Sequence, residues 1–459
     1  MKIQPPRGMR DFTPEVLKKR YYVMDVLKRH FNGYGFLPIE TPAIELLSTL
    51  TGKYGDEGDQ LIYKILNSRL NEQPNKPEIN TSFQNHLNAG LNSTLLTEKA
   101  LRYDLTVPLA RFVATHRHAL AFPFRRYQIQ PVWRADRPQK GRYREFWQCD
   151  VDVIGARSLM NETELIQLAD AVFETLQLPV TLFINHRSIL NGMADAFKIS
   201  NQAEKFMGLL DKLDKQSFQD LRNDFAALGL SAEALEQLEQ LLLLKSPKEK
   251  LPFQNPLLEQ GLQELITVMD FVSPRWITLQ WSPLLARGLS YYTGCIVEAK
   301  VRSGSLQSSI LGGGRYDQLG SLFGYTDLSG VGISFGIDRI CDVLEELNLF
   351  PASVQSASFS KILFTELDGI DDELYLQETE KIKKEINEYN LTVYDTISKI
   401  KKLEPISSNT KIVYNEQYTV TNEDLLLVKT ENSATIFLNQ NSSEFVTIKS
   451  LTNTTIKPN

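Results

Sequence analysis

The strongest constraint on the fold of this chain lies in residues 124–155, where two runs of sequence alternate between polar and apolar side chains. Residues of equal parity in a β-strand lie on the same face, so each run predicts a strand with one polar and one apolar face. The charged stretch between the runs predicts a turn that joins two antiparallel strands. The polar residues are Arg126, Gln128, Gln130 and Arg134 in the first run, and Gln148, Asp150 and Asp152 in the second.

This polar face has two interpretations. A solvent-exposed face of a sheet is the more common explanation for any single charge. The group as a whole favours a ligand site, because an exposed face would favour Lys and Glu and because a cationic turn repels itself unless an anion binds. A polyphosphate above an acidic pocket accounts for both signs of charge. The charged residues of the turn are Asp136, Arg137, Lys140, Arg142 and Arg144.

The N-terminal part of the chain begins with a predicted helix. Thr13 is a suitable cap, Pro14 suits the first helical position, and the helix is expected to end at Gly33 and Gly35. Its apolar stripe comprises Val16, Leu17, Val23, Leu27 and Phe31.

The following segments differ in composition. Residues 36–44 contain two prolines and predict an edge or kinked strand. Residues 67–92 are rich in Asn, Gln, Ser and Pro, and we interpret them as a long exposed loop. A helix is expected at residues 107–115. Residues 188–271 have Leu at helical spacing, which predicts a small helical insertion.

The C-terminal part contains a domain boundary. Gly-rich, strand-like sequence occupies residues 277–335, and a helix is expected at 337–347. Residues 346–360 include a Ser-rich stretch and predict a linker. Residues 361–459 should form a separate α/β domain with one clear helix at 372–389. For 459 residues the prior is about three domains, and the elements together indicate a mixed α/β protein.

Composition excludes several classes of protein. The formal net charge is −6, so any contact with nucleic acid must come from local basic patches. No apolar run approaches the ~18 residues of a membrane helix, and the N-terminal sequence has no apolar signal core. The cysteines are far apart, which excludes a Cys-based zinc finger or disulfide framework and indicates a reducing compartment. They are Cys149, Cys295 and Cys341.

Two more segments combine glycine with arginine and tyrosine. In residues 287–294, Arg287 can reach a site from a turn, and Tyr291 and Tyr292 can orient a small polar substrate; a hairpin with two core tyrosines is an equally good interpretation. In residues 312–317 and 330–339, the glycines allow a ligand or a backbone to approach closely. Arg339 lies in the first turns of the helix that follows, where a lone arginine is usually a surface residue.

These segments together resemble the class II aminoacyl-tRNA synthetases, and most closely the histidyl-tRNA synthetase family. The opening PPRGMRDF matches the family, residues 35–45 are similar to motif 1, residues 132–155 to motif 2, and residues 330–339 to motif 3. Residues 285–294 and 311–317 resemble the two signature peptides of histidyl enzymes. The resemblance covers roughly residues 1–345, apart from the polar segment after Leu66, and implies an antiparallel-sheet catalytic core flanked by helices.

The resemblance also implies roles for individual residues. Arg134 and Arg339 match the arginines that hold the ATP phosphates, and Arg287 matches the catalytic arginine. The histidine site implied by the same match includes Arg134 and Arg287. Asp104, Thr106 and Gln148 match positions around the α-amino group, and Asp152, Tyr291 and Tyr292 match positions around the imidazole.

The implied activity is formation of histidyl-adenylate from L-histidine and ATP, then transfer to tRNA(His), by a cytoplasmic homodimer that pairs through motif 1. Mg²⁺ is implied as a companion of ATP, and the sequence has no dedicated metal site. Residues 361–459 occupy the place of the anticodon-binding domain, although the chain after residue 405 lacks the expected glycines and Ser290 stands where the family often has Asp. The alternative is a non-catalytic paralogue, the histidine-sensing regulatory subunit of ATP phosphoribosyltransferase.

Overall fold

The computed structural model describes residues 3–139, 141–286, 292–304, 308–317 and 328–351, the single residues 320, 324 and 354, and the backbone of seven strands after residue 361. For residues 55–57 only the backbone is described. The chain forms two compact units, Met1–Phe350 and Pro351–Asn459.

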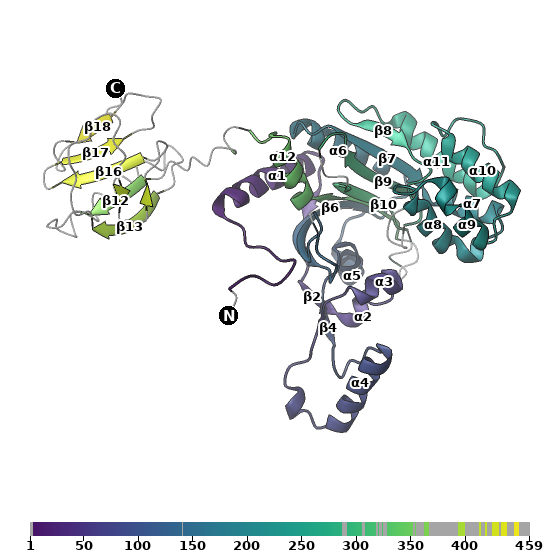
Figure 1. The fold of residues 1–459 in the computed structure, drawn as a ribbon, viewed down its shortest axis with the longest axis horizontal. Helices are drawn as coiled ribbons and strands as arrows, with labels where there is room; N and C mark the ends of the chain where they lie inside the picture. Colours follow the sequence, from purple (N-terminus) through teal and green to yellow (C-terminus); the bar gives the residue numbers. More distant parts are fainter. Residues whose placement is uncertain are drawn as a thin grey trace. The chain divides into compact units, whose positions relative to one another are not determined.

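An eight-stranded sheet forms the centre of the first unit (Figure 1). The two predicted strands at residues 124–155 are antiparallel neighbours inside this sheet, as expected. Only the outermost pairs, β1 with β5 and β7 with β8, are parallel. In spatial order the strands are β1 (Leu37–Pro38), β5 (Phe124–Trp133), β6 (Glu145–Ile154), β11 (Gly330–Gly336), β10 (Leu311–Arg315), β9 (Cys295–Val301), β7 (Val180–His186) and β8 (Thr278–Trp281).

Three helices, α1 (Pro14–Gly33), α6 (Met160–Thr175) and α12 (Ile337–Glu346), cover one face of this sheet (Figure 1). Phe31 of α1 and Phe173 of α6 both pack against Phe335 of β11, with ring centroids 5.9 and 5.8 Å away. The predicted bounds of α1 are confirmed, but its predicted apolar stripe is partly wrong. Val16 is 41% exposed, because the helix packs against the core only from Arg20 onward.

The other face of the sheet is partly covered by α5 (Thr106–His116), which lies on the opposite side from α1 and α12 (Figure 1). Leu109 and Val113 of α5 belong to a core cluster that also contains Phe124 and Ile154 at the ends of β5 and β6. The polar residues of β5 and β6 lie on this face, because they share the parity of Phe124 and Ile154.

The predicted loop at residues 67–92 is wrong, because this segment contains the helix α4 (Lys76–Ala89) and the short 3₁₀ helix η1 (Leu70–Glu72). Pro77 in the first turn of α4 and Gly90, with φ +66°, just after its end are ordinary start and stop signals. The polar composition hid these signals. The expected exposure is confirmed, since no residue of α4 is buried.

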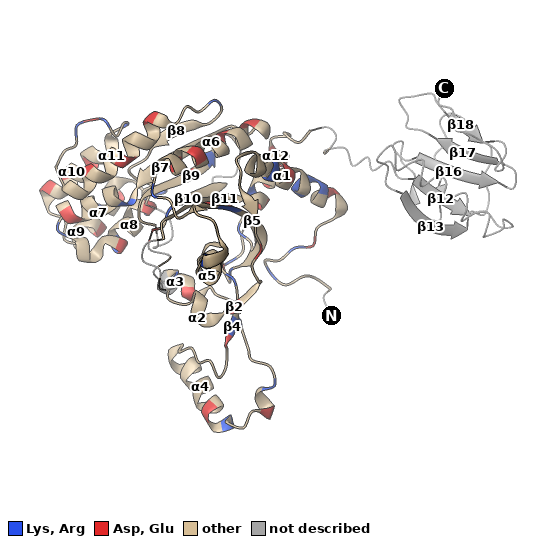
Figure 2. Cartoon of the chain, turned by 180° about the vertical axis from the view of Figure 1, so that it is seen from behind, with Lys and Arg blue, Asp and Glu red and all other residues tan. Residues whose placement is uncertain are grey.

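The segment containing α4 projects away from the large sheet, and the charges of the helix lie in its first turns (Figures 1 and 2). It leaves and re-enters the unit through a three-stranded sheet in which β4 lies between β2 and β3. The elements of this region are β2 (Ile44–Leu46), α2 (Leu47–Leu50), α3 (Gly55–Gln60), β3 (Lys64–Ile65) and β4 (Lys99–Leu101), with η2 (Arg117–Ala119) following α5.

The predicted helical segment after residue 187 is helical throughout most of its length. Its long final helix packs against its first, and both contact β7, the second strand from one edge of the sheet. The elements are α7 (Arg187–Ala196), η3 (Ser200–Gln202), α8 (Ala203–Lys212), α9 (Phe218–Ala227), α10 (Ala232–Leu243) and α11 (Pro256–Phe271).

The second unit contains a five-stranded sheet in the order β13-β12-β16-β17-β18. β12 pairs in parallel with both β13 and β16, whereas β17 and β18 continue the sheet antiparallel. The helix expected at residues 372–389 lies outside the described residues. The strands are β12 (Ile362–Glu366), β13 (Val393–Lys399), β16 (Leu425–Thr430), β17 (Ser433–Phe437) and β18 (Phe445–Ile448), with β14 (Val413–Tyr414) and β15 (Tyr418–Thr419) paired separately.

Among the helices that the structure describes, none combines the length and the apolar character needed to cross a bilayer.

Candidate active site

The register of the sheet brings the predicted polar residues into one row. Asp152 on β6 lies opposite Arg126 on β5 and opposite Gly332 on β11. Four residues earlier on β6, Gln148 lies between Gln130 and Gly336 in the same way. Side chains from the polar strands therefore face one another, and glycines on β11 leave space beside them.

The polar row is buried. Arg126 and Gln128 have no exposed surface, and Asp150 and Asp152 are each 3% exposed. The guanidinium of Arg126 lies 2.8 Å from Asp152 Oδ2 and also donates to Gln128 Oε1 at 3.3 Å. The interpretation as a solvent-exposed sheet face is therefore wrong, and these charges are held inside the protein at a cost that needs compensation.

Asp152 has a second partner that the sequence analysis did not identify. The hydroxyl of Tyr316, which follows β10, donates a hydrogen bond to Asp152 Oδ1. Burial, and next the charge of Asp152, raise the pKa of Tyr316 well above its usual value, so this tyrosine stays protonated. The segment containing Tyr316 was recognised from its glycines, but only the fold brings its hydroxyl to residue 152, more than 160 positions away.

Asp104 is buried two residues before the start of α5 (Thr106–His116). Its Oδ1 accepts hydrogen bonds from the Tyr54 hydroxyl at 2.9 Å and from the Val107 backbone N–H at 3.1 Å. Thr106 is the first residue of α5. Burial, followed by the charge of Asp104, raises the pKa of Tyr54 well above its usual value. Tyr54 was not predicted from the sequence, because nothing in its local pattern indicates a buried polar partner.

The carboxylates of the row perturb one another. Burial raises the pKa of Asp150 to about 7; the charge of Arg126 opposes this rise and the charge of Asp152 adds to it. Burial also raises the pKa of Asp152, against the opposing effects of Arg126 and Tyr316. The site therefore contains acidic groups that a bound cation would stabilise in their ionised form.

Several buried polar atoms of this row lack a hydrogen-bond partner within the described part of the chain. They are Arg126 Nε, Gln148 Oε1 and Asp150 Oδ1. The amide nitrogen of Gln148 donates to Ser334 Oγ on β11 at 3.3 Å, which leaves its oxygen facing the row. Unpaired polar atoms are rare in protein interiors, and a cluster of them indicates a place where a polar ligand binds.

Arg134 follows β5 and is held at the base of the charged turn. Its Nε donates to Tyr103 O at 3.0 Å, and its guanidinium lies 4.3 Å from the centre of the Tyr103 ring. Its backbone N–H donates to Arg144 O at 2.9 Å. One planar face of the guanidinium thus stacks on an aromatic ring, and this contact fixes its orientation.

Arg339 lies in the first turn of α12 and reaches the same turn from another direction. Its Nε donates to Gly141 O at 2.8 Å and its Nη1 donates to Ser309 O at 2.6 Å. Arg134 and Arg339, which are more than 200 residues apart, therefore contact one turn. Arg339 is partly buried, and these two bonds fix the orientation of its guanidinium.

The expectation that the turn repels itself needs a correction. Arg142 forms a bidentate ion pair with Asp136, at 2.9 and 3.0 Å, and Arg144 Nε donates to the backbone oxygen of Asp136. The turn neutralises part of its own charge, so its composition alone does not require an anion. Lys140 lies outside the described residues.

Two of the predicted site residues, Arg287 and Tyr291, lie outside the described residues. Tyr292 is described and partly buried beside the core cluster that contains Tyr316. Its ring lies against β10, where a Cβ on Gly314 would be 3.1 Å from Tyr292 Cδ1. The row of polar side chains is therefore bordered by two tyrosines, from the two segments that combine glycine with tyrosine.

The fold is similar to that of solved structures. The histidyl-tRNA synthetase from Nostoc sp. PCC 7120 superposes with a TM-score of 0.69, over 98% of this chain and 97% of that one, at 23% identity. An ATP phosphoribosyltransferase regulatory subunit/histidyl-tRNA synthetase from Bacillus halodurans superposes with a TM-score of 0.65 at 22% identity, over 86% and 92%. The fold is that of the class II aminoacyl-tRNA synthetases.

Sequence comparison identifies the family within this class of enzymes. Residues 97–340 match the family model described as histidyl-tRNA synthetase. Histidine--tRNA ligases of Azobacteroides pseudotrichonymphae and Christiangramia forsetii are 44% and 45% identical to this chain. The alignments cover 84% and 83% of this chain and 88% and 85% of those proteins. This chain belongs to the histidyl-tRNA synthetase family.

Proposed function

We propose that this protein activates L-histidine with ATP to form histidyl-adenylate and then transfers the histidyl group to tRNA(His). Family membership supports the reaction. The observation that carries the assignment of the site is the row formed by the buried Arg126, Asp150 and Asp152 with the partly buried Gln148, whose atoms include several without a hydrogen-bond partner among the described residues. A ligand with a cationic amino group and a polar ring would supply partners for this row.

The α-amino group of histidine is assigned to the acidic end of this site. Asp104, Thr106 and Gln148 surround it, and the free oxygen of Gln148 can accept one of its hydrogen bonds. The buried Asp150 adds a negative charge nearby. A bound ammonium would lower the pKa of these carboxylates and hold them ionised, because opposite charges attract most strongly in a buried site.

The imidazole is assigned to Asp152 with Tyr291 and Tyr292. A buried imidazole needs a donor or acceptor for each ring nitrogen, which is why a pocket of this kind can reject apolar amino acids of similar size. We add Tyr316 to this group, because its hydroxyl donates to Asp152 Oδ1 while Arg126 pairs with Oδ2, and the two contacts together fix the orientation of the carboxylate.

Activation of histidine brings two negatively charged groups together, the histidine carboxylate and the ATP triphosphate. The histidine carboxylate attacks the α-phosphorus of ATP, the bond to the β-phosphate breaks, and pyrophosphate leaves. Arg287 is assigned to the attacking carboxylate and the α-phosphate, and Arg134 and Arg339 to the phosphates. Fixed guanidinium groups stabilise the charge that builds on the phosphoryl oxygens, so no proton-transfer residue is needed. Arg134 and Arg287 also border the histidine.

Mg²⁺ arrives with ATP and is part of the substrate in this scheme. In the second step, the 3′-terminal ribose hydroxyl of the tRNA attacks the carbonyl carbon of the adenylate, and AMP leaves. Residues 361–459 are proposed to bind the anticodon region. The parallel arrangement of β13, β12 and β16 is compatible with an α/β domain of this kind.

The protein is proposed to act as a homodimer in the cytoplasm. The dimer is assigned to motif 1, residues 35–45. Leu37, Ile44 and Leu46 in and beside this motif are 63%, 47% and 48% exposed in the single chain. Large apolar side chains grouped on one short segment favour a protein interface over free solvent.

The regulatory-subunit alternative is disfavoured by the motifs. The class II fold does not separate the two functions, because a solved structure titled as an ATP phosphoribosyltransferase regulatory subunit/histidyl-tRNA synthetase has the same fold. Arg134, Arg287 and Arg339 are all present in this chain, and a second unit follows residue 350. A histidine sensor would not need the three arginines.

The decisive test is pyrophosphate exchange into ATP with each of the twenty amino acids. We expect exchange with histidine alone. The variant Arg287→Ala should lose at least 10²-fold in exchange rate while it still binds histidine, because a cation that acts on the transition state is removed. Exchange with another amino acid, or no exchange at all, would overturn the proposal; full activity in Arg287→Ala would remove its catalytic role only.

A further inference from the structure

Arg315, the last residue of β10, lies on the face of the sheet opposite the active site. It pairs in register with Val331 of β11, and this row packs beneath α6. The next residue, Tyr316, reaches the other face, where its hydroxyl contacts Asp152. Alternation along a strand thus separates the two side chains, and the guanidinium of Arg315 is placed where it cannot touch the substrate.

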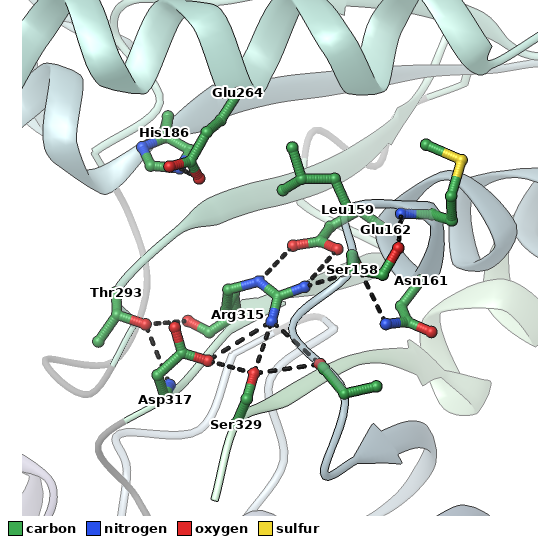
Figure 3. Close-up of polar contacts among 12 residues, drawn as sticks. Ser158, Leu159, Asn161, Glu162, His186, Glu264, Thr293, Arg315, Asp317 and Ser329 are labelled. Atoms are coloured by element: carbon green, nitrogen blue, oxygen red, sulfur yellow. Dashed lines mark hydrogen bonds and ion pairs between the residues drawn. The ribbon is translucent and has the colours of Figure 1, made fainter. Parts of the chain in front are cut away.

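Arg315 is one of the most highly connected side chains in the described part of the structure (Figure 3). Its Nε and Nη2 form a bidentate ion pair with both carboxylate oxygens of Glu162 on α6, each at 2.6 Å. Nη2 also donates to Ser158 O at 3.2 Å, and Nη1 donates to Ser329 Oγ at 2.6 Å. The side chains of Arg315 and Glu162 are 5% and 3% exposed, so the pair is buried on both sides.

The backbone of Arg315 joins the two tyrosine-bearing segments of the active site. Its carbonyl oxygen accepts a hydrogen bond from the Thr293 backbone N–H at 2.8 Å, directly after Tyr292. The hydroxyl of Thr293 accepts from the Asp317 backbone N–H at 3.0 Å, and Asp317 in turn accepts a hydrogen bond from Ser329. Figure 3 shows Arg315 surrounded by these groups. These hydrogen bonds therefore tie the segment that contains Tyr292 to the segment that contains Arg315 and Tyr316.

Small residues make room for this cluster. A Cβ on Gly294 would lie 2.9 Å from Arg315 Cδ, so a larger residue there would push the arginine out of place. The cost of burying Glu162 raises its pKa, and its hydrogen bonds with Arg315 oppose that rise. A buried, bidentate Arg–carboxylate pair holds one geometry only when both partners are present.

We propose that Arg315 and Glu162 are positioning residues for the histidine pocket: their ion pair, on the far face of the sheet, holds Tyr316 against Asp152 and Tyr292 against β10. The inference rests on the proposed function, since it assigns those tyrosines and Asp152 to histidine. The pair acts through the backbone of β10 and touches neither substrate. Its loss should therefore change histidine binding selectively, because the described contacts of Arg134 and Arg339 include neither residue.

The test compares two glutamates on one helix. Glu162→Gln removes the charge that pairs with Arg315. Glu164→Gln is the matched control, because Glu164 lies two residues later on α6 and forms an equally bidentate pair with Arg125, at 2.8 Å for both bonds. Arg125 lies near the start of β5, and its other described hydrogen bond goes to Tyr34 O, away from the tyrosine segments. Pyrophosphate exchange gives KM for histidine and for ATP in each variant.

We expect Glu162→Gln to raise KM for histidine about tenfold, with KM for ATP changed less than twofold. Glu164→Gln should leave both constants within about twofold of the unaltered protein. Ser329→Ala, which removes one bond to Arg315 without leaving a buried charge, should raise KM for histidine about threefold and keeps the test possible if Glu162→Gln does not fold.

Three results would overturn the inference: an unchanged KM for histidine in Glu162→Gln or, if that variant does not fold, in Ser329→Ala; an equal rise in both KM values; or the same rise in Glu164→Gln. In all three cases the unaltered protein would still catalyse histidine-dependent pyrophosphate exchange. Failure of the proposed function would instead appear as the absence of this exchange in the unaltered protein.

Discussion

The substitution Gly332→Ala should weaken histidine binding strongly, because the added methyl group would overlap the carboxylate of Asp152. Gly332 lies opposite Asp152 in the β6–β11 register. A Cβ at position 332 would lie 1.9 Å from Asp152 Oδ1 and 2.5 Å from its Cγ. Non-bonded heavy atoms need about 3.5 Å, so the carboxylate would have to retreat by about 1.5 Å.

A retreat of this size separates Asp152 from its partners. The ion pair with Arg126 at 2.8 Å and the hydrogen bond from Tyr316 would both be lost or badly strained. Breaking a buried ion pair typically costs about 3–5 kcal/mol. We expect the free energy of unfolding to fall by a similar amount. Histidine affinity should fall by about 100-fold or more, which corresponds to ~3 kcal/mol.

Isothermal titration of histidine, without ATP, measures the affinity, and urea denaturation measures the stability. Gly312→Ala is the control, since Gly312 lies on the adjacent strand β10 and a Cβ there would come no closer than 3.9 Å to any neighbour, Val297 O. The reasoning is refuted if Gly332→Ala binds histidine as tightly as the unaltered protein, or if Gly312→Ala loses as much affinity.

Two further predictions concern the acidic row and the second unit. The pKa of Asp150 is about 7 in the folded protein and about 3.8 in an unfolded chain. Between these two pH values the folded state keeps a proton that the unfolded state has lost. The free energy of unfolding should therefore fall as pH rises from about 4 to 7. Asp150→Asn removes this dependence, and its stability relative to the unaltered protein, measured by urea denaturation, should increase across that window; parallel curves would contradict the assignment. Deleting the residues after Ser360 should spare histidine-dependent pyrophosphate exchange but lower tRNA charging at least tenfold, and unchanged charging would show that residues 361–459 do not contribute to tRNA recognition.

Predictions from periodicity were successful where a single element determines the pattern. The alternation in residues 124–155 gave the right strands, pairing and faces, because side-chain direction along a strand depends on the local backbone alone. The bounds of α1 were also predictable, because Pro14 and Gly33 favour the start and the end of a helix through their own backbone preferences. Composition misled in residues 67–92, where α4 begins at ordinary helix signals within a polar sequence that buries none of its side chains.

The tyrosine contacts show the limit of reasoning from the sequence. Tyr54 and Tyr316 each donate to a predicted carboxylate, yet they come from segments 50 and 164 positions away from it. Neither has a local pattern that distinguishes it from a core tyrosine. Partner choice of this kind depends on which segments the topology brings together, and no spacing within one segment contains that information.

The amino-acid sequence alone determined the polar face of β5 and β6, the resemblance to class II synthetases and the arginines assigned to ATP. Only the tertiary structure decided that this face is buried, that Asp152 is held between Arg126 and Tyr316, and that Arg315 pairs with Glu162 on the opposite face of the sheet. The physical reason is that periodicity specifies the direction in which a side chain points. What covers that side chain, and so whether its charge is solvated or paired, depends on residues far away in the chain.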